Sequence, residues 1–85
     1  GNIFVVGFAA ETENILAHGK KKIADKNLDM IVVNDLTLEG AGFNTETNIV
    51  HLLYRDGREE RLPLMSKYEL AHLILDRIKE NKGKV

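Results

Sequence analysis

Two lysines spaced four residues apart are the first candidates for chemistry in this sequence. Lys22 and Lys26 fall near the end of a predicted helix, where i, i+4 residues share a face. The lysine ammonium is a flexible point charge that suits phosphate where bidentate geometry is not required, so both groups could hold an anionic ligand such as a triphosphate. The same spacing is typical of a solvated basic face with favourable charge at a helix C-terminus. Spacing alone leaves both interpretations open.

A second group of candidates stands at the ends of two predicted strands. Phe8 is flanked by small residues, Gly7 and Ala9-Ala10. An aromatic residue in a buried strand is normally core, but small neighbours would let the ring of a ligand approach the backbone. Asn34 and Asp35 end the next strand, where they could cap a turn or exchange a proton with a bound substrate.

Other residue types exclude several chemistries. The chain contains no cysteine, which excludes disulfides, thiolate metal sites and cysteine nucleophiles within this stretch. His18, His51 and His72 lack metal-ligand spacing and are expected to be surface or partly packed residues. Gly40-x-Gly42 falls short of a dinucleotide fingerprint and does not stand between a strand and a helix, so we interpret it as a flexible loop.

A β-α-β unit is predicted to position these candidates. The continuous apolar run Ile3–Ala10 favours a strand covered on both faces, as in a parallel sheet. Thr12 is the expected N-cap of a helix from about Glu13 to Asp25, with Glu11 and Glu13 near its positive end. The buried side of this helix is predicted to carry Ile15, Leu16, Gly19, Ile23 and Ala24.

The second strand of this unit, Asp29–Val33, should run parallel to the first, through a right-handed crossover. Parallel pairing places the C-terminal ends of both strands at one sheet edge. That edge gathers residues 7–11 and 34–35, and open α/β sheets bind ligands there.

The second half of the chain predicts a hairpin and a helix. In order, it gives a loop over 36–48, a strand over 49–54, a partner strand over 59–62, and a helix from Ser66 to about Asn81. Asp56-Gly57 is a strong two-residue turn signal. Pro63 marks either the end of its strand or a sheet edge, because proline cannot donate to a ladder.

Length and charge limit the class of protein. The chain has 85 residues, of which 44% are apolar, and this predicts one packed domain. The 12 Lys+Arg residues balance 13 Asp+Glu, so the basic excess of a nucleic-acid binder is missing. No apolar run reaches the roughly 20 residues of a membrane span. The start lacks an initiator Met and the basic region of a signal peptide, which predicts a fragment of a longer cytoplasmic chain.

Four motifs in a fixed order give the sequence a family resemblance. They are Val6-Gly7-Phe8-Ala9-Ala10-Glu11-Thr12, Lys22-x-x-x-Lys26-Asn27-Leu28-Asp29, Val33-Asn34-Asp35 and Gly42-Phe43-Asn44. Together they resemble the C-terminal half of the phosphopantothenoylcysteine synthetase family, often fused in bacteria behind a flavin-dependent decarboxylase. The resemblance implies an α/β, Rossmann-like three-layer fragment with a βαβ unit, a β-hairpin extension and a C-terminal helix. Residues 1–85 would be the C-terminal portion of the synthetase domain, without its N-terminal half.

The resemblance also implies a reaction. In this family CTP (ATP in some eukaryotic relatives) activates the carboxylate of 4′-phosphopantothenate as an acyl-nucleotide with release of pyrophosphate. The amine of cysteine then displaces the nucleotide monophosphate. Mg²⁺ accompanies the nucleotide, and FMN belongs only to a fused decarboxylase domain that is not present here. The isolated fragment is expected to be inactive.

Residue by residue, Phe8 resembles the family's nucleotide-contacting aromatic residue, and Lys22 and Lys26 resemble its CTP-binding lysines. Ala9, Asn34, Asp35 and Asn44 also match motif positions. Asp35 is a candidate for holding Mg²⁺ through water, and Asn44 for facing the substrate or a partner subunit. The family is dimeric, which makes the hairpin over 49–62 a candidate interface. The alternative is a stand-alone α/β interaction module with a basic helix face, and nucleotide discrimination would separate the two.

Overall fold

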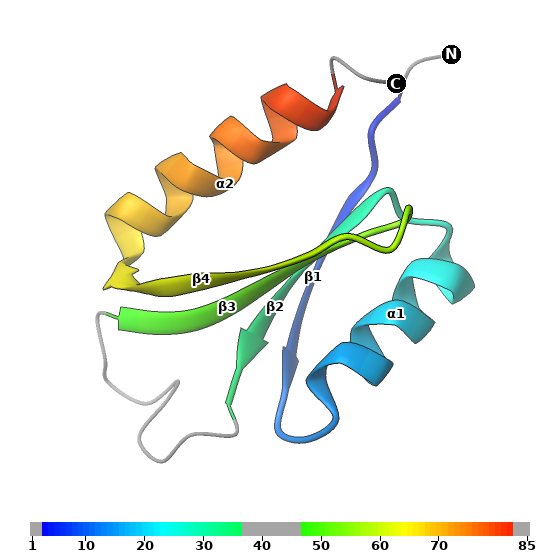
Figure 1. Ribbon diagram of the computed structural model, residues 1–85, viewed down its shortest axis with the longest axis horizontal. Coiled ribbons are helices and arrows are strands. Elements are labelled where there is room, and N and C mark those ends of the chain that lie inside the picture. The colour runs from blue at the N-terminus through cyan, green and yellow to red at the C-terminus, as the bar shows by residue number, and fades with distance from the viewer. Residues whose placement is uncertain (1–2, 37–46, 83–85) are drawn as a thin grey trace.

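The computed structural model describes residues 3–36 and 47–82. Its six elements are β1 (Val6–Glu11), α1 (Ile15–Lys26), β2 (Met30–Asp35), β3 (Thr47–Tyr54), β4 (Glu59–Ser66) and α2 (Lys67–Lys82). They form one sheet in the order β1-β2-β3-β4. The β1–β2 pair is parallel, whereas β2–β3 and β3–β4 are antiparallel. Figure 1 shows α1 on one face of the sheet and α2 on the other, so the predicted three-layer α/β architecture is confirmed.

The strand β2 is the centre of the packing, with side chains in both apolar layers. Met30 and Val32 belong to the cluster that α2 covers, and Ile31 and Val33 belong to the cluster that α1 covers. All four are at most 4% exposed. Successive side chains on a strand point to opposite faces, and burial of both faces explains why this segment is apolar without interruption.

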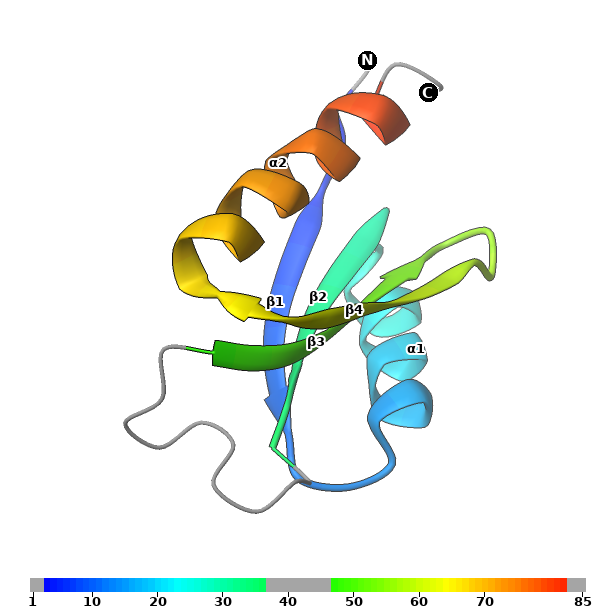
Figure 2. The ribbon, with the colours of Figure 1, turned by 60° about the vertical axis from the view of Figure 1, so that its left-hand side comes forward.

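The prediction that β1 is covered on both faces is wrong for the described residues. This strand is an outer strand of the sheet, and Phe8 remains 70% exposed. The helix α2 contacts β4 and crosses one face of the sheet in Figure 2, where it covers Met30 and Val32 of β2 but leaves Phe8 exposed. An apolar run therefore identified a strand but not its neighbours.

The start of α1 also differs from the prediction. The helix begins at Ile15, after Asn14 in the left-handed region with φ of 46°, and without a side-chain cap hydrogen bond. Thr12 is therefore not the cap, because β1 continues to Glu11 and the chain needs a turn before the helix. Of the predicted buried side, Gly19 and Ile23 are buried, whereas Leu16 and Ala24 are exposed.

The hairpin and the last helix follow the prediction closely. Gly57 adopts a φ of +98° and its N–H donates to the Tyr54 carbonyl at 3.0 Å. The strand β4 runs through Pro63, which an edge strand tolerates. The Ser66 hydroxyl accepts the Glu69 N–H at 3.2 Å, as expected of a helix cap. Neither helix within residues 3–36 and 47–82 is long and apolar enough to cross a membrane.

An ion pair fastens α2 to the hairpin and makes stability depend on pH. The Arg77 guanidinium donates twice to the Glu60 carboxylate at 2.9 Å, and this hydrogen bonding lowers the pKa of Glu60 below 4.5. A lowered folded-state pKa stabilises the protein above the unfolded pKa, and the contribution is lost as pH falls through the folded pKa. We expect Glu60→Gln to cost about 1 kcal/mol at pH 7, or about 4–8 °C in Tm.

Thermal unfolding at pH 7 and pH 3 checks this expectation. The difference between wild type and Glu60→Gln should shrink as the pH is lowered toward 3, because the contribution of the ionised carboxylate is lost as the pH falls through its folded-state pKa. Glu59→Gln is the matched control, because Glu59 pairs with Lys20 at a more exposed position. An equal Tm loss at both pH values would show that the charge of Glu60 is not the cause.

Candidate functional site

The register of β1 and β2 sets out the candidate site. Ala10 pairs with Asn34 and Glu11 pairs with Asp35, so the two strands end side by side. Because side chains alternate along a strand, Phe8 and Asn34 point to the α2 face of the sheet, while Glu11 and Asp35 point to the α1 face. The sequence-predicted residues at this edge are therefore divided between two faces.

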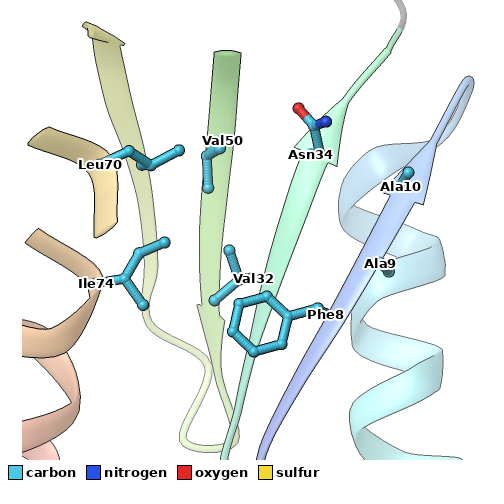
Figure 3. Close-up of a pocket in the computed structure, with 8 residues that line it drawn as sticks. All are labelled: Phe8, Ala9, Ala10, Val32, Asn34, Val50, Leu70 and Ile74. Carbon is cyan, nitrogen blue, oxygen red and sulfur yellow. The ribbon is translucent and has the colours of Figure 1, made fainter. Parts of the chain in front are cut away.

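The α2 face of this edge carries an apolar hollow of about 420 Å³. Figure 3 shows Phe8 lying across the sheet near Val32, with Leu70 and Ile74 of α2 opposite. The complete lining is Phe8, Ala9, Ala10, Val32, Asn34, Val50, Leu70 and Ile74. The prediction that Phe8, Ala9 and Asn34 lie together is consistent with this arrangement.

Asn34 supplies the unusual polar group of the hollow. Its Oδ1 is buried and has no hydrogen-bond partner within the part of the chain that the structure describes. A buried acceptor without a partner costs about 1–3 kcal/mol. Because Asn34 also lines the hollow, a rotation of its amide would let a ligand supply the missing hydrogen bond.

The α1 face of the same edge carries a charged hollow of about 390 Å³. It is lined by Glu11, His18, Lys21, Lys22, Asp25 and Lys26, which places the two predicted lysines on one face. Lys22 Nζ donates to Glu11 Oε1 at 3.1 Å. Lys26 is exposed and has no ion-pair partner among the described residues, so its ammonium is available for a ligand.

Asp35 lies on the α1 face, and its predicted contact with Mg²⁺ through water stays a prediction. Its carboxylate is buried and lies 3.1 Å from Nε2 of His51 on β3. The described residues contain no group of three or more side chains that could hold a metal ion. The chain therefore shows no metal site of its own around Asp35 in these ranges. Asn44 lies outside the described residues.

The basic face of α1 is largely neutralised. Lys20 pairs with Glu59 at 2.8 Å, Lys21 pairs with Asp25, and Lys22 pairs with Glu11. This pairing weakens the alternative of a basic interaction face, since three of the four lysines on the helix already have acidic partners. The same pairing is compatible with selective phosphate binding by Lys22 and Lys26.

The sequence places Glu11 at the ligand-binding edge of the sheet but assigns it no role beyond favourable charge near the helix N-terminus. It predicts His51 only as a surface or partly packed residue and does not place it at the site. A signal for Glu11 was present, because the last residues of two parallel strands lie side by side when the strands are in register. His51 had no comparable signal, since its contact with Asp35 depends on the antiparallel register of β3.

The chain is a three-layer α/β domain with hollows near the carboxyl ends of its parallel strands, which is where open α/β sheets bind their ligands. The chain belongs to the family described as DNA/pantothenate metabolism flavoprotein C-terminal domain, which it matches over residues 1–81.

Curated relatives give the same picture. The chain is 50% identical over 74 residues to the coenzyme A biosynthesis bifunctional protein CoaBC of Bacillus subtilis (strain 168), covering 87% of this chain and 18% of that protein. It is 45% identical over 75 residues to the protein of the same name in Escherichia coli (strain K12), covering 88% of this chain and 18% of that protein. The chain therefore spans about a fifth of the length of these relatives.

Solved structures share the fold. The crystal structure of the C-terminal domain of coenzyme A biosynthesis bifunctional protein CoaBC superposes with a TM-score of 0.78 at 36% identity, over 96% of this chain and 36% of that chain. The DNA/pantothenate metabolism flavoprotein from Streptococcus pneumoniae gives a TM-score of 0.67 at 19% identity, over 93% of this chain and 33% of that chain. The second match supports the fold alone.

Proposed function

We propose that this chain supplies the nucleotide-binding part of a CTP-dependent ligase that joins 4′-phosphopantothenate to cysteine through an acyl-cytidylate. Membership of the pantothenate-metabolism family and similarity to CoaBC proteins support this role in coenzyme A biosynthesis. The observation that carries the proposal is the unpartnered buried Oδ1 of Asn34, which lines the apolar hollow together with Phe8. A separate charged hollow contains Lys22 and Lys26 of α1 and Glu11 of β1.

The apolar hollow suits the base of the nucleotide. Phe8 and Val32 offer a flat apolar surface, and Asn34 Oδ1 can accept an N–H from the exocyclic amine of cytosine. Uracil carries a carbonyl oxygen at the same position, so it would place a second acceptor against Asn34. This contact favours CTP over UTP.

The charged hollow suits the phosphates. The base and the lysines lie on opposite faces of the sheet, so the nucleotide would cross the C-terminal end of β1 to reach both. Lys22 and Lys26 would then neutralise phosphate charge from α1, while positioning supplies most of the rate enhancement. Mg²⁺ commonly keeps several waters and binds through substrate phosphates. The described residues contain no group of three or more side chains that could hold the ion.

The remaining parts of the reaction fall to a longer polypeptide. We propose that residues 1–85 are the C-terminal portion of the synthetase domain. The sites for 4′-phosphopantothenate and cysteine would then be completed by other segments. Pairing of two copies through the β3–β4 hairpin also stays a prediction.

Pyrophosphate release by the full-length polypeptide tests the proposed function. With 4′-phosphopantothenate, cysteine and Mg²⁺ supplied, we expect release with CTP and much less with ATP or UTP. Omitting 4′-phosphopantothenate should abolish release, because its carboxylate is the acceptor of the nucleotide. A folded protein that releases no pyrophosphate with any nucleotide would contradict the proposal and favour the interaction module.

The variant Asn34→Leu separates binding from stability at the site. Leucine removes the unpartnered acceptor, so we expect the Tm to stay the same or rise, although the KM for CTP rises about tenfold. The preference for CTP over UTP should also disappear. Thermal unfolding and steady-state kinetics with both nucleotides measure these effects. An unchanged CTP/UTP ratio in this variant would exclude Asn34 as the base contact.

A further inference from the structure

The carboxylate of Glu11 is the shared anchor of two basic side chains. Its Oε1 lies 3.1 Å from Lys22 Nζ and 3.5 Å from His18 Nδ1. The Glu11 side chain is only 11% exposed, whereas that of Lys22 is 36% exposed. The contact therefore ties a partly exposed lysine to a nearly buried acid at the end of β1.

A second carboxylate is paired in register with this anchor. Glu11 and Asp35 are paired in register on neighbouring strands, and two adjacent carboxylates repel unless each has a cationic or hydrogen-bonding partner. Lys22 and His18 lie beside Glu11, and His51 lies beside Asp35 at 3.1 Å. The result is a row of acids and bases across α1, β1, β2 and β3.

The anchor changes what Lys22 can do. A lysine side chain has high rotamer entropy, and binding a ligand with a free lysine requires that entropy to be lost. Lys22 is already ordered by Glu11. Its ammonium has three donors, and one contact with Glu11 leaves two for phosphate oxygens. Lys26 has no comparable tether within the described part of the chain.

We propose that Glu11 is a positioning residue, which holds the Lys22 ammonium ready for the phosphates of the nucleotide. This inference rests on the proposed function. It also predicts that the effect of the Glu11 carboxylate on CTP binding changes sign when Lys22 is removed. While Lys22 is present, the carboxylate is neutralised and helps binding. Once Lys22 is removed, the same carboxylate is left without that partner and repels the phosphates.

A double-mutant cycle in the full-length polypeptide tests the inference, with KM and kcat for CTP measured at fixed Mg²⁺. Glu11→Gln keeps the shape of the side chain and should raise the KM about tenfold with a smaller change in kcat. In the Lys22→Ala background, Glu11→Gln should leave the KM unchanged or lower it. Glu13→Gln is the matched control, because it removes the same charge from an exposed side chain two residues away and should leave the KM unchanged.

The outcomes separate the two levels of the proposal. If Lys22→Ala raises the KM and Glu11→Gln raises it by the same factor in both backgrounds, Glu11 does not act through Lys22 and this inference alone is overturned. If Lys22→Ala leaves the KM unchanged, the proposed phosphate site is wrong and the inference falls with it. Loss of folded protein would lower the apparent kcat rather than the KM, so the KM can be compared between variants even if part of a variant is unfolded. Direct titration with CTP provides a second readout.

Discussion

Replacing Lys22 by alanine in the full-length polypeptide is expected to weaken CTP binding about ten- to a hundredfold, because a charge-assisted hydrogen bond contributes roughly 1.5–3 kcal/mol. Lys26→Ala should have a smaller effect, since this lysine is exposed and its charge is more strongly screened by water and salt. Titration calorimetry with CTP measures both constants, and pyrophosphate release should fall in parallel.

A neighbour on the same helix is the matched control for this prediction. Lys20 has the same charge as Lys22 but does not line the charged hollow, and its ammonium pairs with Glu59. The Lys20→Ala variant should therefore bind CTP as the wild type does. A non-selective basic face would instead make the lysines of the helix equivalent, bind any polyphosphate, and lose it as salt is raised. Equal losses for Lys20→Ala and Lys22→Ala would therefore support that alternative.

The part of the site that could be predicted from sequence depends only on elements that are neighbours along the chain. A strand, a helix and a second strand with short links bring Phe8 and Asn34 to one edge of a parallel pair, whatever the rest of the sheet does. The i, i+4 spacing places Lys22 and Lys26 on one face in the same way. Both groupings are seen in the structure.

The part that could not be predicted depends on contacts between distant segments. The exposure of Phe8 follows from where α2 lies on the sheet, and no feature of the apolar run encodes that position. The contact between Asp35 and His51 needs the register of β2 against β3. The N-cap of α1 is Asn14, in the left-handed region, and not the predicted Thr12, because β1 continues for one more residue than the apolar run.

The second large effect is expected at Gly19, a buried glycine in the middle of α1. Alanine is the better helix former by about 1 kcal/mol, so helix propensity alone predicts that Gly19→Ala stabilises the protein. The packing predicts the opposite: an added Cβ would lie 2.3 Å from Leu53 Cδ1 and 3.3 Å from Val33 Cγ2. Both neighbours are at most 1% exposed, which leaves them little room to move.

Overpacking of a core costs about 1–3 kcal/mol, so we expect Gly19→Ala to destabilise the protein by about 1–2 kcal/mol after the gain in propensity is subtracted. At about 4–8 °C for each kcal/mol, the loss is easily seen in thermal unfolding. The matched control is the reverse change at an exposed position of the same helix, Ala17→Gly, which should cost only the propensity difference.

Leu53→Ala tests the cause of this loss. Alone it should cost about 2–5 kcal/mol, but in combination with Gly19→Ala the total should be smaller than the sum, because the new methyl group enters the space that Leu53 leaves. Gly19→Ala should also weaken CTP binding if it pushes α1 away from the sheet, since Lys22 reaches Glu11 from that helix. A rise in Tm for Gly19→Ala would mean that helix propensity outweighs the close approach. The position of Lys22 would then not depend on a small residue at 19.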